Sequence, residues 1–474
     1  MNTYEKNYWT VYLDFLDDFS ELEYKGYSLA YLFHYGSLIR NNKELIKSLH
    51  DPVYTNSLKN TVNDISDIQQ TFSKKKDSIQ IPFQKKEDGI ILLHDVYDLL
   101  RFPNETFYHY FDKRKTLIVQ DTIPQRKEKT YLVGLQGYSI QNFDNYKIDM
   151  KAPINKLKKE AQVILSKHPN HLVYDDPTFR SRFFMQIAKI VNRVEEAANL
   201  FRKVPISTVI VPSTHYPESR TLVFVAARHG IPTICMQHGI IGKEFGYIPK
   251  IADVDAVYGP QDMNWYLNNG VDKEGLEIIG HPRFDLIKQV PKLKQEEIKQ
   301  NLAIDPTKKT ILLIIRGQLL LKEWTAFLDQ ISTNDNVNVI IKDFRYKKNH
   351  PLQDTHSFVY SSKGYHHYDL FSIADVVVSY PSTVALEAML AKKPVFILGE
   401  PSPGYTGYYD DMKKLIQDDP KQLSTLVSDF FTNKELQSYM NKTISTFLSK
   451  SYINNIPSGQ RLMRLIDSLS NKSF

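Results

Sequence analysis

Cysteine is nearly absent from this sequence. Its 474 residues include one cysteine, Cys235, so no intramolecular disulfide can form. No group of cysteines and histidines has the spacing of a zinc site. These absences exclude a disulfide-stapled secreted domain and a zinc-dependent fold, and they favour a reducing, cytoplasmic compartment.

Long apolar runs are also lacking. Nowhere do about 18 consecutive apolar residues occur, which is the length that a membrane-spanning helix needs. Residues 1–18 contain acidic side chains and no apolar segment of the kind that forms a signal peptide. We therefore expect neither secretion nor a membrane-spanning segment.

The charge is close to balanced. The chain carries 60 Lys and Arg against 54 Asp and Glu, a formal net charge of +6. This excess is weak for such a length, and no recognition motif is present, which excludes nucleic-acid binding. Basic runs occur at 74–76, 85–86 and 113–115, within the more basic segment 74–160. They either form a face for anionic lipid headgroups or phosphorylated substrates, or lie in solvated loops.

Length and residue pattern predict several domains, since one domain usually holds about 100 to 200 residues. Residues 1–88 have apolar positions at helical spacing and no convincing strand, which predicts a helical extension. Short apolar runs separated by helical stretches then predict two α/β domains, 89–285 and 286–450. Residues 451–474 are predicted to form a terminal helix that packs back on the first domain.

The α/β pattern consists of short runs of β-branched and aliphatic residues, typical of strands buried on both faces of a parallel sheet. The runs are 90–94, 116–120, 207–211, 232–236, 255–258 and 277–279, then 310–315, 337–341, 376–378 and 394–398. The predicted fold class is α/β, with two doubly wound Rossmann-type domains facing a cleft. Ligands bind beyond the carboxyl ends of such strands, so the loops that follow strands hold the candidate site.

One of these loops carries small hydroxyl residues and leads into a helix. Backbone N–H groups at a helix N-terminus bind phosphate oxygens, so Ser382 and Thr383 are candidate phosphate ligands, while Ser382 is equally a simple N-cap. Glu387 lies one turn further into the helix. It either accepts hydrogen bonds from vicinal hydroxyls of ribose or glycerol, or forms an ion pair with Lys392 or Lys393.

Two cations follow strands of the second domain. Arg316 ends its first predicted strand and Lys342 ends the next. Positive charge there suits a diphosphate leaving group, because the charge that develops on it must be neutralised if no metal does so. We therefore expect these two side chains to contact a donor, and we expect no metal and no cofactor.

A histidine follows a strand of the first domain. His238 is a candidate general base, because an unperturbed imidazole titrates near working pH, or it is a hydrogen-bonded structural side chain. His215, Glu218, His281 and Arg283 lie in other loops that follow strands and are weaker candidates for acceptor contacts. The segment that holds His281 and Arg283 is also a candidate interdomain hinge.

Taken together, these segments resemble the GT-B glycosyltransferase superfamily, in its branch of CDP-glycerol glycerophosphotransferases and related surface-polymer transferases. The similar motifs are the Gln-His-Gly of 237–239, Arg316, the Ile-Ile-Lys strand end at 340–342, the segment 367–376 and the loop 379–383. In length and motifs the chain also looks like the spore-coat polysaccharide biosynthesis proteins of this group.

The resemblance implies a transferase that moves a sugar or glycerol phosphate from a nucleotide-activated donor to a surface polysaccharide or lipid-linked acceptor. By this resemblance His238 would activate the acceptor. The residues that would bind the donor are Arg316, Lys342, Ser382, Thr383 and Glu387. The helical extension and the basic segment 74–160 would recognise the acceptor, in peripheral contact with anionic lipid at the inner membrane face.

Departures from the family pattern leave the donor open. Glycerophosphotransferases usually have Asp-Tyr-Ser-Ser where this chain has Ser-Tyr-Pro-Ser at 379–382, and the His-Pro pair is displaced to 350–351. The Glu-Ala pair at 387–388 is similar to that of sugar-transferring GT-B enzymes. The donor is therefore expected to be a nucleotide sugar or CDP-glycerol.

Two alternative functions remain. A non-hydrolysing UDP-sugar 2-epimerase has the same fold but needs carboxylates from the first domain, for which Glu218 and Asp285 are the candidates. A non-catalytic assembly partner would bind a nucleotide sugar without turnover.

Overall fold

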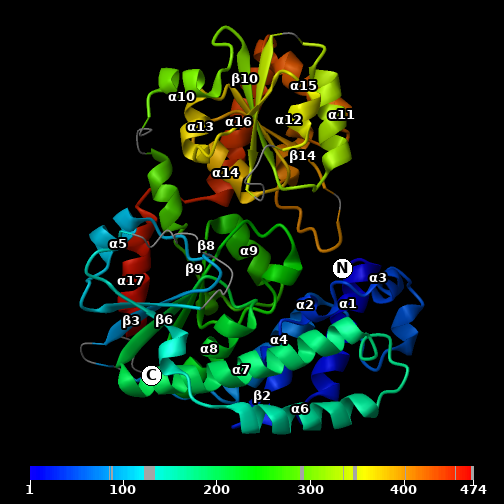
Figure 1. Ribbon diagram of the computed structural model, residues 1–474, viewed down its shortest axis with the longest axis vertical. Coiled ribbons are helices and arrows are strands. Elements are labelled where there is room, and N and C mark those ends of the chain that lie inside the picture. Colours follow the sequence, from blue (N-terminus) through cyan, green and yellow to red (C-terminus); the bar gives the residue numbers. More distant parts are fainter. Residues whose placement is uncertain are drawn as a thin grey trace. The chain divides into compact units, whose positions relative to one another are not determined.

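The computed structural model divides the chain into two compact units (Figure 1). Unit 1 comprises residues 1–238, 243–283 and 454–474, and unit 2 comprises residues 239–242 and 284–453. The structure describes residues 1–84, 86, 89–121, 134–288, 293–334, 336–344, 350–400, 402–453 and 455–470. Part of the basic segment, including Lys85 and residues 122–133, lies outside the described residues.

Unit 1 is built on a parallel sheet with the order β5-β4-β3-β6-β7-β8-β9. Its strands are β3 (Ile90–Asp95), β4 (Thr116–Gln120), β5 (Ser139–Asn142), β6 (Ile206–Val211), β7 (Thr233–Met236), β8 (Val254–Val257) and β9 (Leu276–Ile278). The order reverses between β3 and β6, as in a doubly wound fold. The central strands β6 and β7 are buried along nearly their whole length, which explains why most of their residues are apolar.

The helices of unit 1 begin at recognisable caps. Asn2 and Glu5 form a capping box on the first helix, and Asp176 caps the long helix that starts at Pro177. The helices are α1 (Thr3–Asp18), α2 (Tyr35–Ile39), α3 (Lys43–Leu49), α4 (Ile65–Asp77), α5 (Asn104–Tyr110), α6 (Lys151–Ser166), α7 (Pro177–Lys203), α8 (Pro217–Arg228), α9 (Pro260–Asn268) and α17 (Ser458–Ser470).

The N-terminal helices are part of unit 1. The rings of Phe15 and Phe19 on α1 lie 6.2 Å and 4.8 Å from the ring of Phe183 on α7, and all three side chains are buried. Such aromatic contacts stabilise the packing of these helices beyond simple burial. The expectation of no strand before residue 88 was wrong, because β1 (Glu23–Tyr24) and β2 (Tyr27–Ser28) form a short antiparallel hairpin.

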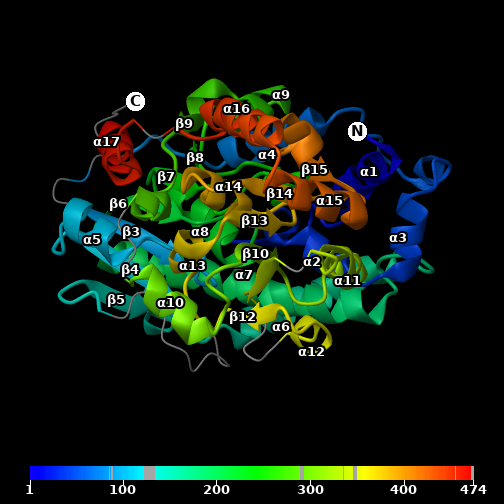
Figure 2. The same ribbon diagram turned by 90° about the horizontal axis from the view of Figure 1, so that it is seen from above.

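Unit 2 repeats the architecture with the order β12-β11-β10-β13-β14-β15, again parallel. Its strands are β10 (Lys309–Ile315), β11 (Val337–Asp343), β12 (Val359–Ser361), β13 (Val376–Ser379), β14 (Val395–Leu398) and β15 (Ile416–Gln417). Its helices are α10 (Gln295–Leu302), α11 (Leu321–Ile331), α12 (Leu352–Thr355), α13 (His367–Ile373), α14 (Thr383–Leu390), α15 (Pro420–Phe430) and α16 (Lys434–Ser451). Figure 2 shows α11 beside α15 over this sheet.

Short edge strands escaped the sequence pattern. β5 contains exposed Ser139 and Ile140, and β15 has only two residues, so neither produces a buried apolar run. Edge strands are half-solvated, which removes the hydrophobic signal on which the prediction depends. The last part of unit 2 forms two helices, α15 and α16, with Asn433 capping the second.

The terminal helix α17 packs against α5 and β6 (Figure 1). Leu462, Leu465 and Ile466 join a buried cluster that includes Phe107 and Ile210. The apolar stripe of this amphipathic helix thus completes the core of unit 1. In the part of the chain that the structure describes, no helix is both long and apolar enough to cross a membrane.

This packing predicts the effect of truncating one core side chain. We expect Leu462→Ala to destabilise unit 1 by about 2–5 kcal/mol, because Leu462 is fully buried and its removal leaves a cavity. The measurement is the thermal unfolding transition followed by circular dichroism. Arg464→Ala, at an exposed position of the same helix, is the control and should shift the transition little. Equal shifts for the two variants would contradict the role of α17 in the core.

Candidate functional site

In unit 2, Arg316 and the loop 379–383 follow the two strands between which the strand order reverses. Strands β10 and β13 are paired and parallel, so Arg316 and the loop 379–383 emerge at the same edge of the sheet. Open α/β sheets bind ligands at this switch point. Arg316 has an exposed side chain and can reach an anion without first leaving a buried position.

The loop after β13 ends in a capped helix. The hydroxyl of Ser382 accepts a hydrogen bond from the amide of Ala385 at 3.4 Å, and Ser379 Oγ lies 2.9 Å from Ser382 Oγ. The hydroxyl of Tyr409 donates to the Ser382 carbonyl at 2.6 Å. Ser382 is therefore an N-cap held in place by its neighbours, and the N-terminal amides of α14 carry the partial positive charge that suits a phosphate.

Thr383 lies at the first position of α14. Its Oγ1 accepts a hydrogen bond from the amide of Ile240 at 3.1 Å. Ile240 belongs to the short segment 239–242 that is part of unit 2. A hydroxyl that accepts in this way still has its own hydrogen to donate, so Thr383 keeps one donor for a ligand oxygen.

Glu387 forms a buried pair with a histidine. Its Oε2 lies 2.6 Å from Nε2 of His367, at the start of α13, and the Glu387 side chain is buried. The ion pair considered from the sequence, with Lys392 or Lys393, is not the contact that forms. Lys393 instead donates to the carbonyl of Ala374 at 3.0 Å. The His367 ring holds the carboxylate of Glu387 in one orientation near the N-terminal turns of α14.

Lys342 is the last residue but one of β11 and is partly buried. Its ammonium donates to the carbonyl of Tyr365 at 2.6 Å and lies 5.6 Å from the centre of the Phe344 ring. Burial lowers the pKa of Lys342, and the nearby Asp369 carboxylate opposes the shift. The hydrogen bond to Tyr365 leaves two of the three N–H groups of Lys342 to contact a ligand. Because it is partly buried and bonded in this way, the Lys342 side chain is less free to move than the exposed side chain of Arg316.

A carboxylate that the sequence analysis missed shapes the loop after β10. Asp343 accepts from the amide of Gly317 at 3.1 Å and 3.2 Å through its two oxygens. Gly317 has φ +58°, a conformation that a residue with a side chain adopts only at a cost. This contact fixes the turn that directly follows Arg316.

In unit 1, His238 follows β7 and is held from three sides. Its ring stacks on Tyr247 with a centroid distance of 5.4 Å, and the Arg283 guanidinium donates to its carbonyl at 3.3 Å. A hydrogen bond with the Pro212 carbonyl occupies one ring nitrogen. The second ring nitrogen is then the one that can take a proton.

The surroundings keep His238 uncharged at neutral pH. Burial lowers the pKa of the imidazole to about 4, helped by the positive charges of Arg101 and Arg283. The pKa starts from an ordinary value near 6.5, so the protonated fraction becomes appreciable only well below neutral pH. A neutral imidazole is the form that accepts a proton in general-base catalysis.

Two of the weaker candidates, His215 and Glu218, contact different groups. His215 lies 3.9 Å from His34 between ring centres, and burial lowers its pKa well below the ordinary value. Glu218 accepts from the Tyr97 hydroxyl at 2.8 Å and from the Lys189 ammonium at 2.9 Å. Its second oxygen is buried and has no hydrogen-bond partner among the described residues.

His281 and Arg283 lie where the chain passes from unit 1 into unit 2, since unit 2 continues from Phe284. His281 is fully buried and burial lowers its pKa well below the ordinary value. Besides contacting His238, Arg283 donates to the Tyr258 hydroxyl at 3.2 Å. These contacts give Arg283 a structural part in positioning the segment around His238.

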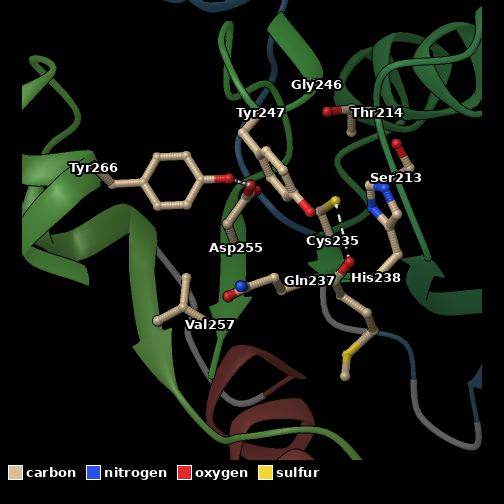
Figure 3. Close-up of a pocket in the computed structure, with 11 residues that line it drawn as sticks. Ser213, Thr214, Cys235, Gln237, His238, Gly246, Tyr247, Asp255, Val257 and Tyr266 are labelled. Carbon is tan, nitrogen blue, oxygen red and sulfur yellow. Dashed lines mark hydrogen bonds between the residues drawn. The ribbon is translucent and has the colours of Figure 1, made fainter. Parts of the chain in front are cut away.

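A narrow pocket opens beside His238 at the carboxyl ends of β6, β7 and β8 (Figure 3). It is lined by Ser213, Thr214, Cys235, Met236, Gln237, His238, Gly246, Tyr247, Asp255, Val257 and Tyr266. All of these residues belong to unit 1. Sequence reasoning missed Asp255 and Tyr266, because Asp255 lies within an apolar run and Tyr266 lies on a helix, away from any loop that follows a strand.

Two buried carboxylates lie at and behind this pocket. Asp262 accepts from the side-chain amide of Gln237 at 2.9 Å, and burial raises its pKa to about 7. Asp255 lines the pocket, and burial raises its pKa to about 6. Both groups titrate far closer to neutral pH than an exposed aspartate, because the charged form is poorly solvated.

Metal ligation is not apparent in the described part of the chain, where no group of three or more His, Cys, Asp or Glu has suitable geometry. The expectation of no metal included the absence of an Asp-x-Asp triplet, and this was wrong, because Asp253 and Asp255 have that spacing. Asp253, however, is paired with Lys76 at 2.5 Å and accepts from the Thr233 hydroxyl at 2.7 Å. Its oxygens are thus engaged within the fold.

The basic run 74–76 is largely engaged in contacts within unit 1. Lys76 is buried through its pair with Asp253, and Lys75 lies 3.6 Å from Glu23. Only Lys74 of this run is classed as exposed. Fewer of these three lysines are therefore available to bind anionic lipid or phosphate than the sequence suggests.

One protein family and several solved structures are similar to this chain. The family model for lipid-A-disaccharide synthetase (LpxB) matches residues 247–401, which is less than half of the chain. No protein of curated function matches the sequence. A putative UDP-N-acetylglucosamine 2-epimerase from Listeria monocytogenes is similar in structure, with a TM-score of 0.52, 12% identity, and coverage of 80% of this chain and 96% of that one.

Two further solved structures are similar. The glycotransferase of kitacinnamycin has a TM-score of 0.50 and 11% identity, covering 81% of this chain and 100% of that one. The wall teichoic acid polymerase TagF has a TM-score of 0.48 and 14% identity, covering 82% of this chain and 91% of that one. The likeness to the epimerase and kitacinnamycin structures and the two Rossmann-like α/β units show a fold of the GT-B type, as the sequence predicted.

Removal of one positive charge near His238 should shift the pKa of its imidazole. Arg101→Met should raise the His238 pKa from about 4 toward its ordinary value, because the repulsion on the imidazolium is reduced. The measurement is an NMR titration of labelled histidine, with His238→Gln to assign the signal. Arg114→Met is the control, since Arg114 is exposed and is not among the charges that shift His238. An unchanged midpoint in Arg101→Met would contradict the account.

Proposed function

We propose that this protein is a GT-B-type transferase that moves a sugar or glycerol phosphate from a nucleotide-activated donor to a hydroxyl of a surface polysaccharide or lipid-linked acceptor. Unit 2 binds the donor and unit 1 activates the acceptor. The observation that carries the proposal is the set of groups at the switch point of unit 2, where Arg316 and the N-terminus of α14 follow paired strands.

The chemistry of these groups suits a nucleotide donor. The amides of α14, the Thr383 hydroxyl and the Arg316 guanidinium are donors for phosphate oxygens, and Lys342 adds a second positive charge. The carboxylate of Glu387, oriented by His367, accepts hydrogen bonds from hydroxyls of the donor. The match to the LpxB family over residues 247–401 spans these loops and supports this assignment.

In the proposed reaction His238 removes the proton of the acceptor hydroxyl through its unoccupied ring nitrogen. The acceptor oxygen forms a bond to the anomeric carbon of a sugar donor, and the bond from that carbon to the nucleoside diphosphate breaks. With CDP-glycerol the new bond is to phosphorus, and cytidine monophosphate leaves. In either case Arg316, Lys342 and the α14 amides stabilise the negative charge of the leaving group, so the proposal requires no metal.

The first test is a thermal-shift panel with CDP-glycerol, UDP-GlcNAc, UDP-glucose, dTDP-rhamnose and the free nucleotides. One donor class should raise the melting temperature, because a ligand that binds only the folded state stabilises it. Arg316→Ala should reduce the shift, since it removes a cation at the phosphate site. Lys308→Ala, a cation at the opposite end of the same strand, is the control. A protein that responds to no donor would contradict the proposal.

The second test separates the base from the donor site. His238→Ala should abolish transfer, measured as release of nucleotide in the presence of acceptor, while the donor-induced thermal shift remains near that of the wild type. EDTA should leave the rate unchanged. Loss of donor binding in His238→Ala would remove this residue from the acceptor role. Donor binding without turnover in the wild type would favour an assembly partner, and formation of an epimeric nucleotide sugar would favour the 2-epimerase.

A further inference from the structure

A loop that lies a few residues after His238 in the chain returns to contact its ring. In this loop, residues 243–250, the ring of Tyr247 stacks on the His238 imidazole, with 5.4 Å between ring centres and 14° between ring planes (Figure 3). The amide of Tyr247 donates to the carbonyl of Glu244 at 2.9 Å. The position of Glu244 therefore helps to determine where Tyr247 meets the imidazole.

The N-terminal helix α1 holds the start of this loop. The indole Nε1–H of Trp9 donates to Oε1 of Glu244 at 2.6 Å, and the Trp9 side chain is fully buried. The ring of Phe245 lies 4.3 Å from that of Tyr8 and 5.5 Å from that of Trp9. Burial raises the pKa of Glu244 to about 7, and the hydrogen bond from Trp9 opposes this shift. The indole donor thus favours the charged carboxylate in this position.

A second helix of the N-terminal extension, α4, holds the end of the loop. Oε1 of Gln69 accepts from the amide of Lys250 at 2.8 Å, and Nε2 of Gln69 donates to the Lys250 carbonyl at 3.0 Å. Gln69 is only 3% exposed, so water competes little for these hydrogen bonds. Both ends of the loop 243–250 are thus bound to helices of the N-terminal extension.

The same extension is also tied to a second segment that contacts His238. The Pro212 carbonyl forms a hydrogen bond with the His238 ring. Two residues further along, the Thr214 carbonyl accepts from Nε of the buried Arg220 at 2.9 Å. Nη1 of Arg220 donates to the carbonyl of Phe33, in the extension, at 2.7 Å. Two chain segments that contact the imidazole are therefore anchored on the extension, one directly and one through Arg220.

We propose that the N-terminal extension positions the base of the transferase, and that Trp9 and Glu244 are positioning residues that act on His238 through Tyr247. The inference rests on the proposed function, because it assigns how the acceptor-activating imidazole is held. A general base works only within hydrogen-bond reach of the proton that it removes, and a displacement of about 1 Å is costly to the rate. The Tyr247 ring covers one face of the imidazole, so release of the loop 243–250 would let the base move.

Glu244 acts by its position and not by its charge. The charges that affect the pKa of His238 are those of Arg101 and Arg283, and the Glu244 carboxylate is not among them. A neutral side chain of the same shape that still accepts from Trp9 should therefore hold the loop equally well. This expectation separates a positioning role from an electrostatic one.

The first test removes the indole donor and keeps an aromatic ring. In the full chain, Trp9→Phe should move the NMR signals of the labelled His238 ring, because the stacked Tyr247 ring shifts. It should also lower kcat of transfer at least about threefold, since the imidazole is in place in fewer molecules, and leave KM for the donor unchanged. Trp324→Phe is the matched control, because Trp324 is also buried but lies on α11 of unit 2. Unchanged His238 signals and kcat in a folded Trp9→Phe protein would overturn the inference.

Variants of Glu244 supply a rescue test. Glu244→Gln keeps an oxygen that accepts from Trp9 and should retain the wild-type His238 signals and kcat, whereas Glu244→Leu should behave as Trp9→Phe does. Equal losses in the two Glu244 variants would overturn the positioning role. If Trp9→Phe does not fold, Gln69→Leu takes its place, because it releases the other end of the loop. Unchanged His238 signals in that variant would then contradict the inference.

The NMR measurement needs no turnover, so it distinguishes failure of this inference from failure of the proposed function. If a donor is bound and transferred while the His238 signals of Trp9→Phe are unchanged, the transferase proposal stands and the positioning role falls. If these signals move in a protein that neither binds nor transfers a donor, the proposed function and the catalytic part of this inference are overturned.

Discussion

The parallel pairing of the strands is the constraint on which both candidate sites depend. In each of the two large sheets all strands run the same way, so every carboxyl end lies at one edge, and one reversal of strand order leaves a gap between the crossover helices there. Arg316 and Ser382 are far apart in sequence, yet they follow paired strands. In unit 1 the same rule brings the ends of β6, β7 and β8 to one pocket.

The two units differ in the electrostatics of these edges. Unit 2 offers a helix N-terminus, an exposed arginine and a partly buried lysine, all of which attract anions. The pocket of unit 1 offers hydroxyls and a carboxylate and no cation among its lining residues. The proposed division of labour, with an anionic donor on unit 2 and an acceptor hydroxyl on unit 1, agrees with this difference in charge.

Arg283 affects both the position and the pKa of His238. Its guanidinium holds the backbone of His238 through the carbonyl, and its charge helps to lower the pKa of the imidazole. The hydrogen bond to Pro212 fixes which ring nitrogen is free to accept a proton. Buried surroundings thus both position the histidine and keep it in the neutral form that a base requires.

The sequence alone determined the buried strands, the loops that follow them and the cap at Ser382, because these features depend on local residue patterns. Tertiary structure alone decided which groups the charged side chains contact. Glu387 pairs with His367 and not with a nearby lysine, and Lys76 pairs with Asp253, which lies far along the chain. The low pKa of His238 comes from burial among distant segments, and so does the Asp255 oxygen that has no hydrogen-bond partner among the described residues. Desolvation depends on every group that packs around a side chain and not only on its neighbours in sequence.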